Sequence, residues 1–280
     1  MALTPGPMVL AAGDIADRDG EAARTAALLR GVPNATVLAL GDNAYRCGSA
    51  DDYEDHYATT WGEESLLART RACPGNHEYG TFLCNEQGRG YFQFFADSHR
   101  DVWAAATKDY YSFAIANCRW HFVSLNSEIT TELNSAQANW LRLNLESNRG
   151  KPILAFFHRP RFSSGHHGSQ EDLQDLWNIL RAFNAEIILN GHDHSYERFL
   201  QQNGQQQLDN QGITQFVIGT GGREHEQDQS RERNSAFAPV NELGVLKLVL
   251  NDTSYDWEFV AVSGRVVDSG LNLPVNIGHT

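Results

Sequence analysis

Short apolar runs recur along the first two thirds of the chain, and each ends in a turn residue followed by a polar residue. The runs occupy Met8–Ala12, Thr36–Leu40, Arg71–Pro74, Ile153–Phe157 and Glu186–Asn190. Apolar runs of this length that are bounded by turns are typical of buried strands. We therefore predict five strands whose carboxyl ends carry polar side chains.

Helical patterns lie between these runs. Asp19 is placed to cap a helix over 20–30, which Gly31 ends. Apolar residues at helical spacing predict two further helices, over 135–148 and 171–183. Strands that alternate with helices indicate an α/β fold, in which ligands gather at the carboxyl ends of the strands.

The last part of the chain changes character and is rich in strands. They are predicted at 215–218, 244–250, 255–262 and 265–268, with turns between the last three. We expect them to form an antiparallel meander that completes a second sheet. No linker rich in Pro, Gly or Ser separates them from the rest, so residues 1–280 are expected to form a single domain.

The chain has 280 residues, and 22 Lys and Arg against 35 Asp and Glu give it a formal charge of −13. An apolar share of 41% is ample for a packed core, which excludes a disordered chain. The acidic balance, without any Lys/Arg-rich run, argues against a nucleic acid or an anionic membrane surface as partner. The oligomeric state stays open.

No apolar run approaches the roughly 18 to 20 residues that span a bilayer, so no membrane segment is expected. The first seven residues do not form a signal peptide, but a secreted or periplasmic protein whose signal had been removed would look the same, so export and a cytoplasmic location both stay open. The cysteines Cys47, Cys73, Cys84 and Cys118 lack zinc-site spacing, and free thiols and one or two disulfides stay open alternatives.

Potential metal ligands follow all five predicted strands. They are Asp14, Asp42, Asn76, His158, His192 and His194. A single Asp after a strand is ordinary turn chemistry, but five strand ends that all carry oxygen or nitrogen donors are not. Carboxylates, an amide oxygen and imidazoles together suit first-row transition metals rather than calcium. Six or more ligands with one shared carboxylate indicate two metal ions close together.

The motifs in this order resemble the calcineurin-like metallophosphoesterase superfamily. They read Gly13-Asp14, Gly41-Asp42-Asn43-Ala44-Tyr45, Gly75-Asn76-His77-Glu78, His158 and Gly191-His192-Asp193-His194. The Tyr three positions after the second Asp is similar to the purple acid phosphatases, and the chain resembles a small, single-domain bacterial member. The resemblance implies a four-layer αββα sandwich of two mixed sheets flanked by helices.

The resemblance also implies a ligand set. Asp14, Asp42, Tyr45 and His194 would bind one metal, and Asp42, Asn76, His158 and His192 would bind the other. A phenolate favours a trivalent ion, so Fe(III) is expected in the Tyr45 site. Fe(II), Zn or Mn is expected in the second site. A hydroxide shared by the two ions would attack phosphorus in line.

Three histidines are candidates for contact with substrate. His77 follows Asn76 directly, and the matching residue of the family contacts substrate. His166 and His167 lie in a loop that resembles the substrate histidines of the plant enzymes, with a spacing that differs by one residue, so either ring is a candidate. Glu78 is expected to orient His77, and Asp193 is interpreted as turn chemistry.

Four arginines near the motifs are candidates for binding a second phosphate or a leaving group. They are Arg159, Arg161, Arg198 and Arg223. The sequence thus predicts a dinuclear phosphomonoesterase that takes a small phosphate ester. The alternatives are a phosphodiesterase that acts on cyclic nucleotides or other small diesters, and a non-catalytic phosphate-binding module, which would have lost its ligands.

Overall fold

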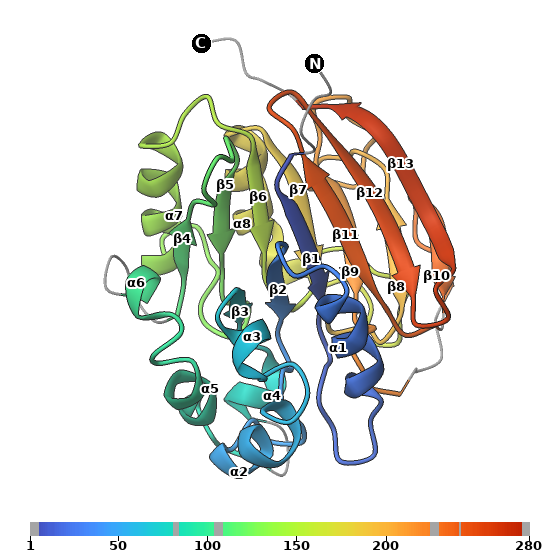
Figure 1. The fold of residues 1–280 in the computed structure, drawn as a ribbon. Coiled ribbons are helices and arrows are strands. Elements are labelled where there is room, and N and C mark those ends of the chain that lie inside the picture. The colour runs from blue at the N-terminus through green and yellow to red at the C-terminus, as the bar shows by residue number, and fades with distance from the viewer. Residues whose placement is uncertain (1–5, 81–83, 104–108, 225–229, 241, 276–280) are drawn as a thin grey trace.

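Two β-sheets lie face to face in the computed structural model, which describes residues 6–80, 84–103, 109–224, 230–240 and 242–275 (Figure 1). The strands of the first sheet are, in spatial order, β13 (Val266–Pro274), β12 (Ser254–Ala261), β11 (Gly244–Leu250), β1 (Met8–Ala12), β2 (Thr36–Leu40) and β3 (Thr70–Cys73). The strands of the second sheet are β10 (Ser235–Val240), β8 (Tyr196–Phe199), β9 (Thr214–Ile218), β7 (Ala185–Asn190), β6 (Ile153–Phe156), β5 (His121–Ser124) and β4 (Tyr111–Phe113).

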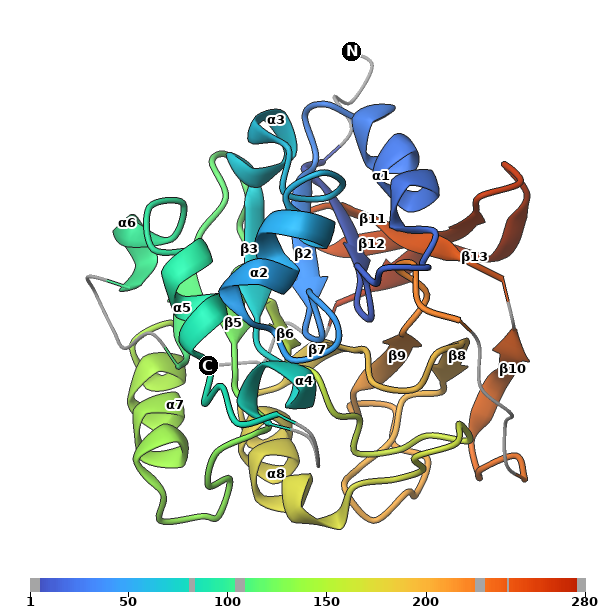
Figure 2. The ribbon, with the colours of Figure 1, turned by 90° about the horizontal axis from the view of Figure 1, so that it is seen from below.

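Helices cover the outer sides of both sheets (Figures 1 and 2). The longest are α1 (Ala22–Arg30) over the first sheet, and α7 (Ala136–Glu146) and α8 (Gln174–Ala182) over the second. The shorter segments are α2 (Ala50–Asp52), the π-helical η1 (Tyr53–Tyr57), α3 (Glu64–Leu67), α4 (Asn76–Tyr79), α5 (Arg89–Phe94), α6 (Arg100–Trp103) and the 3-10 helix η2 (Glu171–Leu173).

Successive residues of β6 show why its sequence is apolar throughout. Leu154 and Phe156 join the core between the sheets together with Val9 and Leu38 of the first sheet. Ala155 points the other way and packs in the cluster under α7 and α8. Because a strand alternates its side chains, a strand covered on both faces must be apolar at every position.

Both sheets are mixed. In the first, β1, β2 and β3 run parallel, while β11 pairs antiparallel with β1. In the second, β5, β6, β7 and β9 run parallel, while β4, β8 and β10 pair antiparallel at the two sides. This arrangement confirms the predicted α/β fold, an αββα sandwich of two mixed sheets flanked by helices.

The predicted place of the last strands is wrong in one respect. The meander β11–β12–β13 extends the first sheet beside β1 and does not complete the second sheet. Of the four strands predicted in this part of the chain, β9, predicted at 215–218, is the one that joins the second sheet, where it runs parallel to β7. The sequence pattern gives strand positions but not the partner of each strand, which depends on crossovers distant in the chain.

The predicted cap at Asp19 is also wrong. Helix α1 begins at Ala22 after Glu21, and no side chain caps it. The backbone N–H of Glu21 donates instead to the carbonyl oxygen of Gly222 across 2.9 Å. Tertiary contact with the turn at Gly222 thus replaces a local cap, and Asp19 lies exposed.

Four strands escaped the sequence pattern. β4 and β5 are short, and β10 pairs irregularly with β8. In β8, two charged residues interrupt the apolar run, because the buried Glu197 binds Ser164 and Arg198 pairs with Asp268. Buried polar residues that are fully paired by distant partners cannot be recognised from local sequence.

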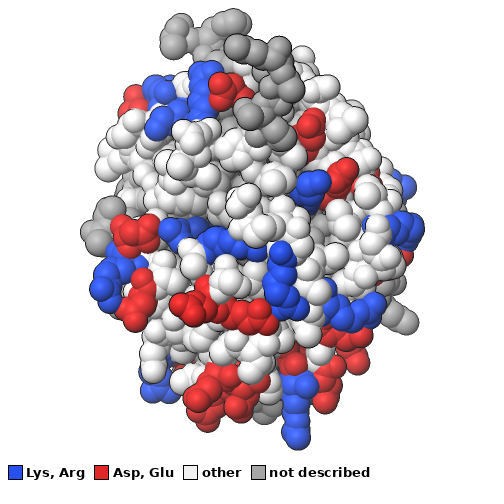
Figure 3. Space-filling model, viewed as in Figure 1, with Lys and Arg blue, Asp and Glu red and all other residues white. Residues whose placement is uncertain are grey.

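Within the described residues, no helix is both long and apolar enough to cross a bilayer. Residues 1–5, on which the expectation about a signal peptide rests, lie outside the described residues. The face in Figure 3 shows Lys and Arg interspersed with Asp and Glu and no broad basic area. The expectation that no nucleic acid is a partner stays a prediction.

Candidate metal centre

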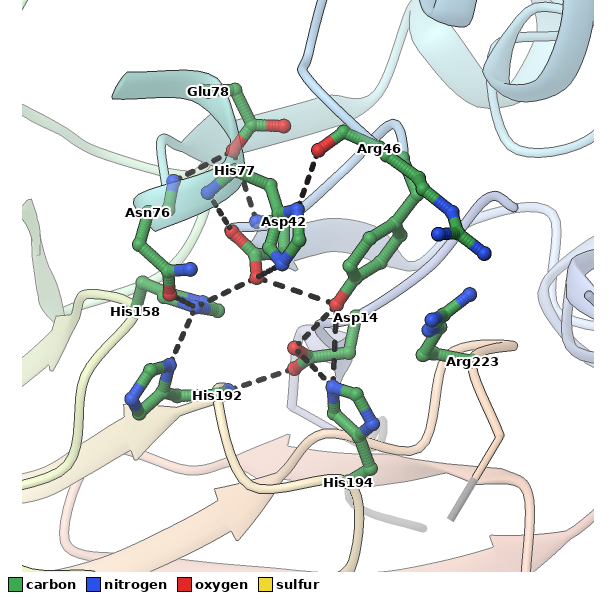
Figure 4. Close-up of polar contacts among 12 residues, drawn as sticks. Asp14, Asp42, Arg46, Asn76, His77, Glu78, His158, His192, His194 and Arg223 are labelled. Carbon is green, nitrogen blue, oxygen red and sulfur yellow. Dashed lines mark hydrogen bonds and ion pairs between the residues drawn. The ribbon is translucent and has the colours of Figure 1, made fainter. Parts of the chain in front are cut away.

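The candidate ligands lie where the carboxyl ends of strands from both sheets meet (Figure 4). Asp14 and Asp42 each stand two residues after a strand of the first sheet, and Asn76 is the first residue of α4 after β3. His158 and His192 each stand two residues after a strand of the second sheet. The parallel parts of both sheets therefore deliver their polar residues to one place.

The backbone at this place is bent in a way that most residues avoid. Asp14, Asp42 and His192 all have a positive φ, of 59°, 47° and 76°. Non-glycine residues adopt this left-handed region at a cost and cluster at functional sites. Gly41, with φ 84°, precedes Asp42, and a Cβ atom on it would lie 2.6 Å from the His158 ring. Only glycine permits this close approach.

One set of donors surrounds the hydroxyl of Tyr45. Its Oη lies 2.9 Å from Oδ1 of Asp14, 3.3 Å from Oδ2 of Asp42 and 3.3 Å from Nε2 of His194. His194 Nε2 lies 3.4 Å from Oδ1 of Asp14. Tyr45, Asp14 and Asp42 are buried, so these atoms form a compact group with little access to water.

A second set of donors surrounds Nε2 of His158. That atom lies 3.3 Å from Oδ2 of Asp42, 3.1 Å from Oδ1 of Asn76 and 3.2 Å from Nδ1 of His192. Asp42 thus takes part in both sets, as the sequence-based ligand assignment requires. Ligand atoms of Asp14, Asp42 and His158 all lie within 4.8 Å of one another.

The histidine rings are held with one nitrogen toward the backbone and the other toward the centre. Nδ1 of His158 lies 2.9 Å from the carbonyl oxygen of Leu40, and Nδ1 of His194 lies 2.8 Å from that of Glu224. A carbonyl only accepts, so Nδ1 carries the proton in both rings. Nε2, which faces the other candidate ligands, is then the nitrogen that can offer a lone pair to a metal, and backbone contacts orient metal-binding histidines in this way.

Charged groups at the centre shift the pKa values of their neighbours. Burial by itself raises the pKa of Asp42, but the rings of His158 and His77 lower it well below its usual range. Burial lowers the pKa of His158, but Asp42 raises it to about 10. Burial and the neighbouring carboxylates Asp14 and Asp42 raise the pKa of Tyr45. A phenolate forms beside two carboxylates only when cations offset their charge, so the donor set fits bound metal ions.

His77 lies beside this centre as predicted, but Glu78 does not orient it. Nδ1 of His77 contacts the carbonyl oxygen of Arg46, its ring lies 4.4 Å from that of Tyr45, and its Nε2 lies 3.8 Å from Oδ2 of Asp42. The carboxylate of Glu78 instead accepts hydrogen bonds from the backbone around Asp42. The expected contact between Glu78 and His77 is therefore wrong.

Of the two loop histidines, His167 lies against the centre. Its ring stacks on that of His192 with the centroids 4.3 Å apart and the planes at 28°. Its centroid is 6.4 Å from that of His194. His166 packs edge-on against His167, with the ring centroids 5.2 Å apart. The structure thus selects His167 as the ring beside the candidate ligands.

Two of the four candidate arginines lie near the donor sets, Arg223 beside Tyr45 and Arg159 close enough for its charge to act on Asp42 and on the His192 ring. Arg223 pairs with Asp17, and its guanidinium sits 4.9 Å from the centroid of the Tyr45 ring. The other three have partners of their own, Arg159 with Glu128, Arg161 with Glu171 and Arg198 with Asp268. The suggestion that Arg161 and Arg198 contact substrate is not supported, because each bonds its carboxylate away from the centre.

A disulfide joins two segments that carry candidate ligands. Cys47 and Cys84 are bonded, while Cys73 and Cys118 are free thiols. Cys47 lies two residues after Tyr45, and Cys84 follows the helix that begins at Asn76. The sequence offered this pairing only as one alternative, because loop geometry decides which cysteines meet.

Two residues that shape the centre do not stand out in the sequence. Arg46 acts through its backbone carbonyl, which any residue would supply. Asp193 was interpreted as turn chemistry, yet it is buried and accepts the backbone N–H of His167 across 2.7 Å. The sequence shows only that Asp193 lies between two predicted ligands, His192 and His194. Its burial and its contact with His167 become visible only in the fold.

Two family models match the chain. The model described as "Calcineurin-like phosphoesterase" matches residues 7–196, and the one described as "Iron/zinc purple acid phosphatase-like protein C" matches residues 212–269. Among curated relatives, purple acid phosphatase 18 of Arabidopsis thaliana is 29% identical over 203 residues, which is 67% of this chain and 44% of that protein. Purple acid phosphatase 15 of the same plant is 29% identical and covers 58% of this chain and 32% of its own length. The chain thus spans less than half the length of these relatives.

Solved structures share the fold. Purple acid phosphatase PPD1 from yellow lupin (Lupinus luteus) seeds aligns with a TM-score of 0.76 at 21% identity, over 94% of this chain and 53% of that one. GAP50, the anchor in the inner membrane complex of Plasmodium, aligns with a TM-score of 0.71 at 15% identity, over 97% of this chain and 90% of that one. At these identities the alignments establish the architecture alone.

Proposed function

Since this chain belongs to the calcineurin-like phosphoesterase family, we propose that it is a dinuclear metal phosphomonoesterase of the purple acid phosphatase kind. The observation that carries the proposal is the sharing of Asp42 between two sets of donors, one around Tyr45 and one around His158. A shared carboxylate between two compact donor sets is the arrangement that a pair of cations requires.

The proposed ligands follow the two sets. Asp14, Asp42, Tyr45 and His194 hold one ion, and Asp42, Asn76, His158 and His192 hold the other. The phenolate of Tyr45 favours Fe(III) in its site. The two imidazoles and the amide oxygen of the second set suit Fe(II), Zn or Mn. The curated relatives of this chain are named purple acid phosphatases, which is consistent with iron in the first site.

When bound, such ions would supply Lewis-acid chemistry, since they would lower the pKa of water and offset the charge of the phosphoryl oxygens. The chain supplies the groups around them. His77 is held by the Arg46 carbonyl with its other nitrogen toward the centre, and His167 stacks on His192. Both rings can donate a hydrogen bond to a phosphoryl oxygen or give a proton to the leaving alkoxide.

The fold alone does not establish catalysis, because GAP50 is described as an anchor and has the same architecture. A non-catalytic module would have no need to keep its ligands. In this chain all seven candidate ligands are present and turned toward one another, from Asp14 to His194. We also propose that residues 1–280 act as one domain, since β11 of the second matched region pairs with β1 of the first.

The test combines metal analysis with rates on a chromogenic phosphomonoester and a phosphodiester over a pH series. We expect bound metal and faster hydrolysis of the monoester. Faster hydrolysis of the diester would favour the phosphodiesterase alternative, and a fully metal-loaded protein that hydrolyses neither would favour a binding module. Asn76→Ala and His158→Ala should abolish hydrolysis, while Asn134→Ala, at an exposed asparagine, should not.

A further inference from the structure

Asp193 stands between His192 and His194, but its carboxylate turns toward the loop of 163–168. It accepts the hydroxyl of Ser163 and the backbone N–H of His167, the latter across 2.7 Å. The side chain is fully buried. A buried carboxylate with two donors from one loop fixes that loop, because leaving either bond unmade would expose a charge to an apolar interior.

The loop is shaped to receive this carboxylate. The hydroxyl of Ser163 also accepts the backbone N–H of Gly165 across 3.0 Å. A Cβ atom on Gly165 would lie 2.3 Å from Cγ of Asp193. The absence of a side chain at Gly165 therefore makes room for Asp193, and the contact is a tightly packed one.

A second carboxylate from the same stretch holds the base of the loop. Glu197, also buried, accepts the backbone N–H of Ser164 across 2.8 Å and its hydroxyl across 2.6 Å. It accepts the hydroxyl of Ser235 as well. Glu197 thus anchors the loop to the sheet, while Asp193 accepts the backbone N–H of His167 and the side chain of Gln170 donates to the His167 carbonyl oxygen across 3.3 Å.

We propose that Asp193 is a positioning residue that holds His167 over the ring of His192, and this inference rests on the proposed function. The stacked rings are 4.3 Å apart, and the hydrogen bond that Asp193 accepts is made by the backbone of His167 itself. Without that bond the N–H of His167 loses its buried acceptor, and what remains is Glu197 at the base of the loop and the contact of the Gln170 side chain with the His167 carbonyl oxygen. The ring then loses its fixed place beside the proposed ligand, and with it the geometry needed at the phosphoryl group.

The test is a double-mutant cycle on the metal-loaded full chain. Asp193→Ala should lower kcat/KM for a phosphomonoester by roughly 10- to 100-fold, the scale of an ångström-sized misplacement. In the His167→Ala background, Asp193→Ala should lower kcat/KM by less than about twofold, since the effects of two residues that act through one another are not additive. Asp193→Asn, which keeps one acceptor oxygen, should recover part of the loss. Metal content should stay at the wild-type level throughout.

Two further readouts do not depend on turnover. Hydrogen exchange of the peptide that contains His167 should speed up in Asp193→Ala, also without metal. The affinity of the loaded protein for inorganic phosphate should fall in Asp193→Ala and not fall further when His167→Ala is added.

The inference is overturned if Asp193→Ala costs the same with and without His167, or if it releases metal, because Asp193 would then serve the turn that holds the ligands. A wild-type protein that binds two metals and phosphate but hydrolyses no ester would contradict the proposed function instead. The phosphate-binding cycle would still decide the role of Asp193.

Discussion

The carboxylate of Glu78 accepts the backbone N–H of Asp42 across 3.0 Å. The same group accepts the N–H groups of Asn43, Ala44 and Gly75 and the hydroxyl of Tyr53. Burial and the charge of Asp42 raise the pKa of Glu78 to about 7, although the N–H groups oppose that rise. One buried carboxylate therefore holds two segments together. The first carries Asp42, and the second carries Gly75 and the next residue, Asn76, where α4 begins.

Replacing Glu78 by Gln should weaken metal binding more than folding. An amide has one acceptor oxygen, and its N–H groups would face the backbone donors of Asp42 and Gly75. Loss of such an outer contact typically costs about 10- to 100-fold in metal affinity. Metal retained during dialysis against a chelator measures the effect, with the thermal unfolding of the metal-free protein as a check on folding. Tyr53→Phe, which removes one bond only, should show a smaller loss, and unchanged retention in Glu78→Gln would refute the role.

Tyr45 offers a spectroscopic test of the first metal site. If its phenolate binds Fe(III), the iron-loaded protein should show a broad visible charge-transfer band, and Tyr45→Phe should lose it. The hydroxyl lies within 3.3 Å of three other candidate donors, which makes it the expected ligand. A colourless protein with a full complement of iron would rule out the ferric assignment.

The disulfide should stabilise both the fold and the centre. It closes a loop with a sequence separation of 37 residues between Cys47 and Cys84. The chain-entropy account gives about 3 to 4 kcal/mol for such a loop. Replacing both cysteines by Ser should lower the free energy of unfolding in urea by that order and speed metal loss. Cys118→Ser, at a free thiol, serves as the control, and an unfolding free energy equal to wild type in the double variant would contradict the expectation.

His99 predicts how stability falls in acid. Its ring is fully buried and accepts the backbone N–H of Ala72, and burial together with the charge of Arg71 lowers its pKa from 6.5 to about 3. In the unfolded chain His99 binds a proton below pH 6.5, whereas in the folded chain it does so only below about pH 3. The contribution of His99 to the free energy of unfolding is therefore fully present above pH 6.5. It decreases as the pH falls toward about 3, by up to about 1.4 kcal/mol per pH unit.

His99→Gln keeps an acceptor for Ala72 and does not titrate. The free energy of unfolding of this variant should depend less steeply on pH than that of the wild type between pH 6.5 and about 3. Urea unfolding over a pH series measures the difference. If the free energy of unfolding depends on pH equally in the two proteins, His99 does not govern the loss of stability in acid.

The sequence predicted most of the centre because its ligands follow strands. A strand end is visible locally, so Asp14, Asp42 and His158 were found from apolar runs alone. The residues that hold them in place were not, since Glu78 and Asp193 act on segments up to 36 residues away. The choice between His166 and His167 likewise depends on a stack with His192 that only the folded loop creates.

The sheets show the same contrast between strand positions, which the sequence predicts, and strand partners, which it does not. β1 and β2 were predicted with the bounds that they have, because both are covered on two faces and read as unbroken apolar runs. The pairing of β11 with β1 joins residues more than two hundred positions apart. No local pattern encodes such a contact, so the meander was assigned to the wrong sheet.

The ratio of metal to protein in Asp42→Ala tests the central claim most directly, with His192→Ala measured beside it. Asp42 belongs to both donor sets, whereas His192 belongs to the second alone. The wild type should hold two ions per chain, His192→Ala should keep the ion of the Tyr45 set, and Asp42→Ala should lose both. Two ions retained by Asp42→Ala, or a wild type that hydrolyses phosphomonoesters without metal, would contradict the account.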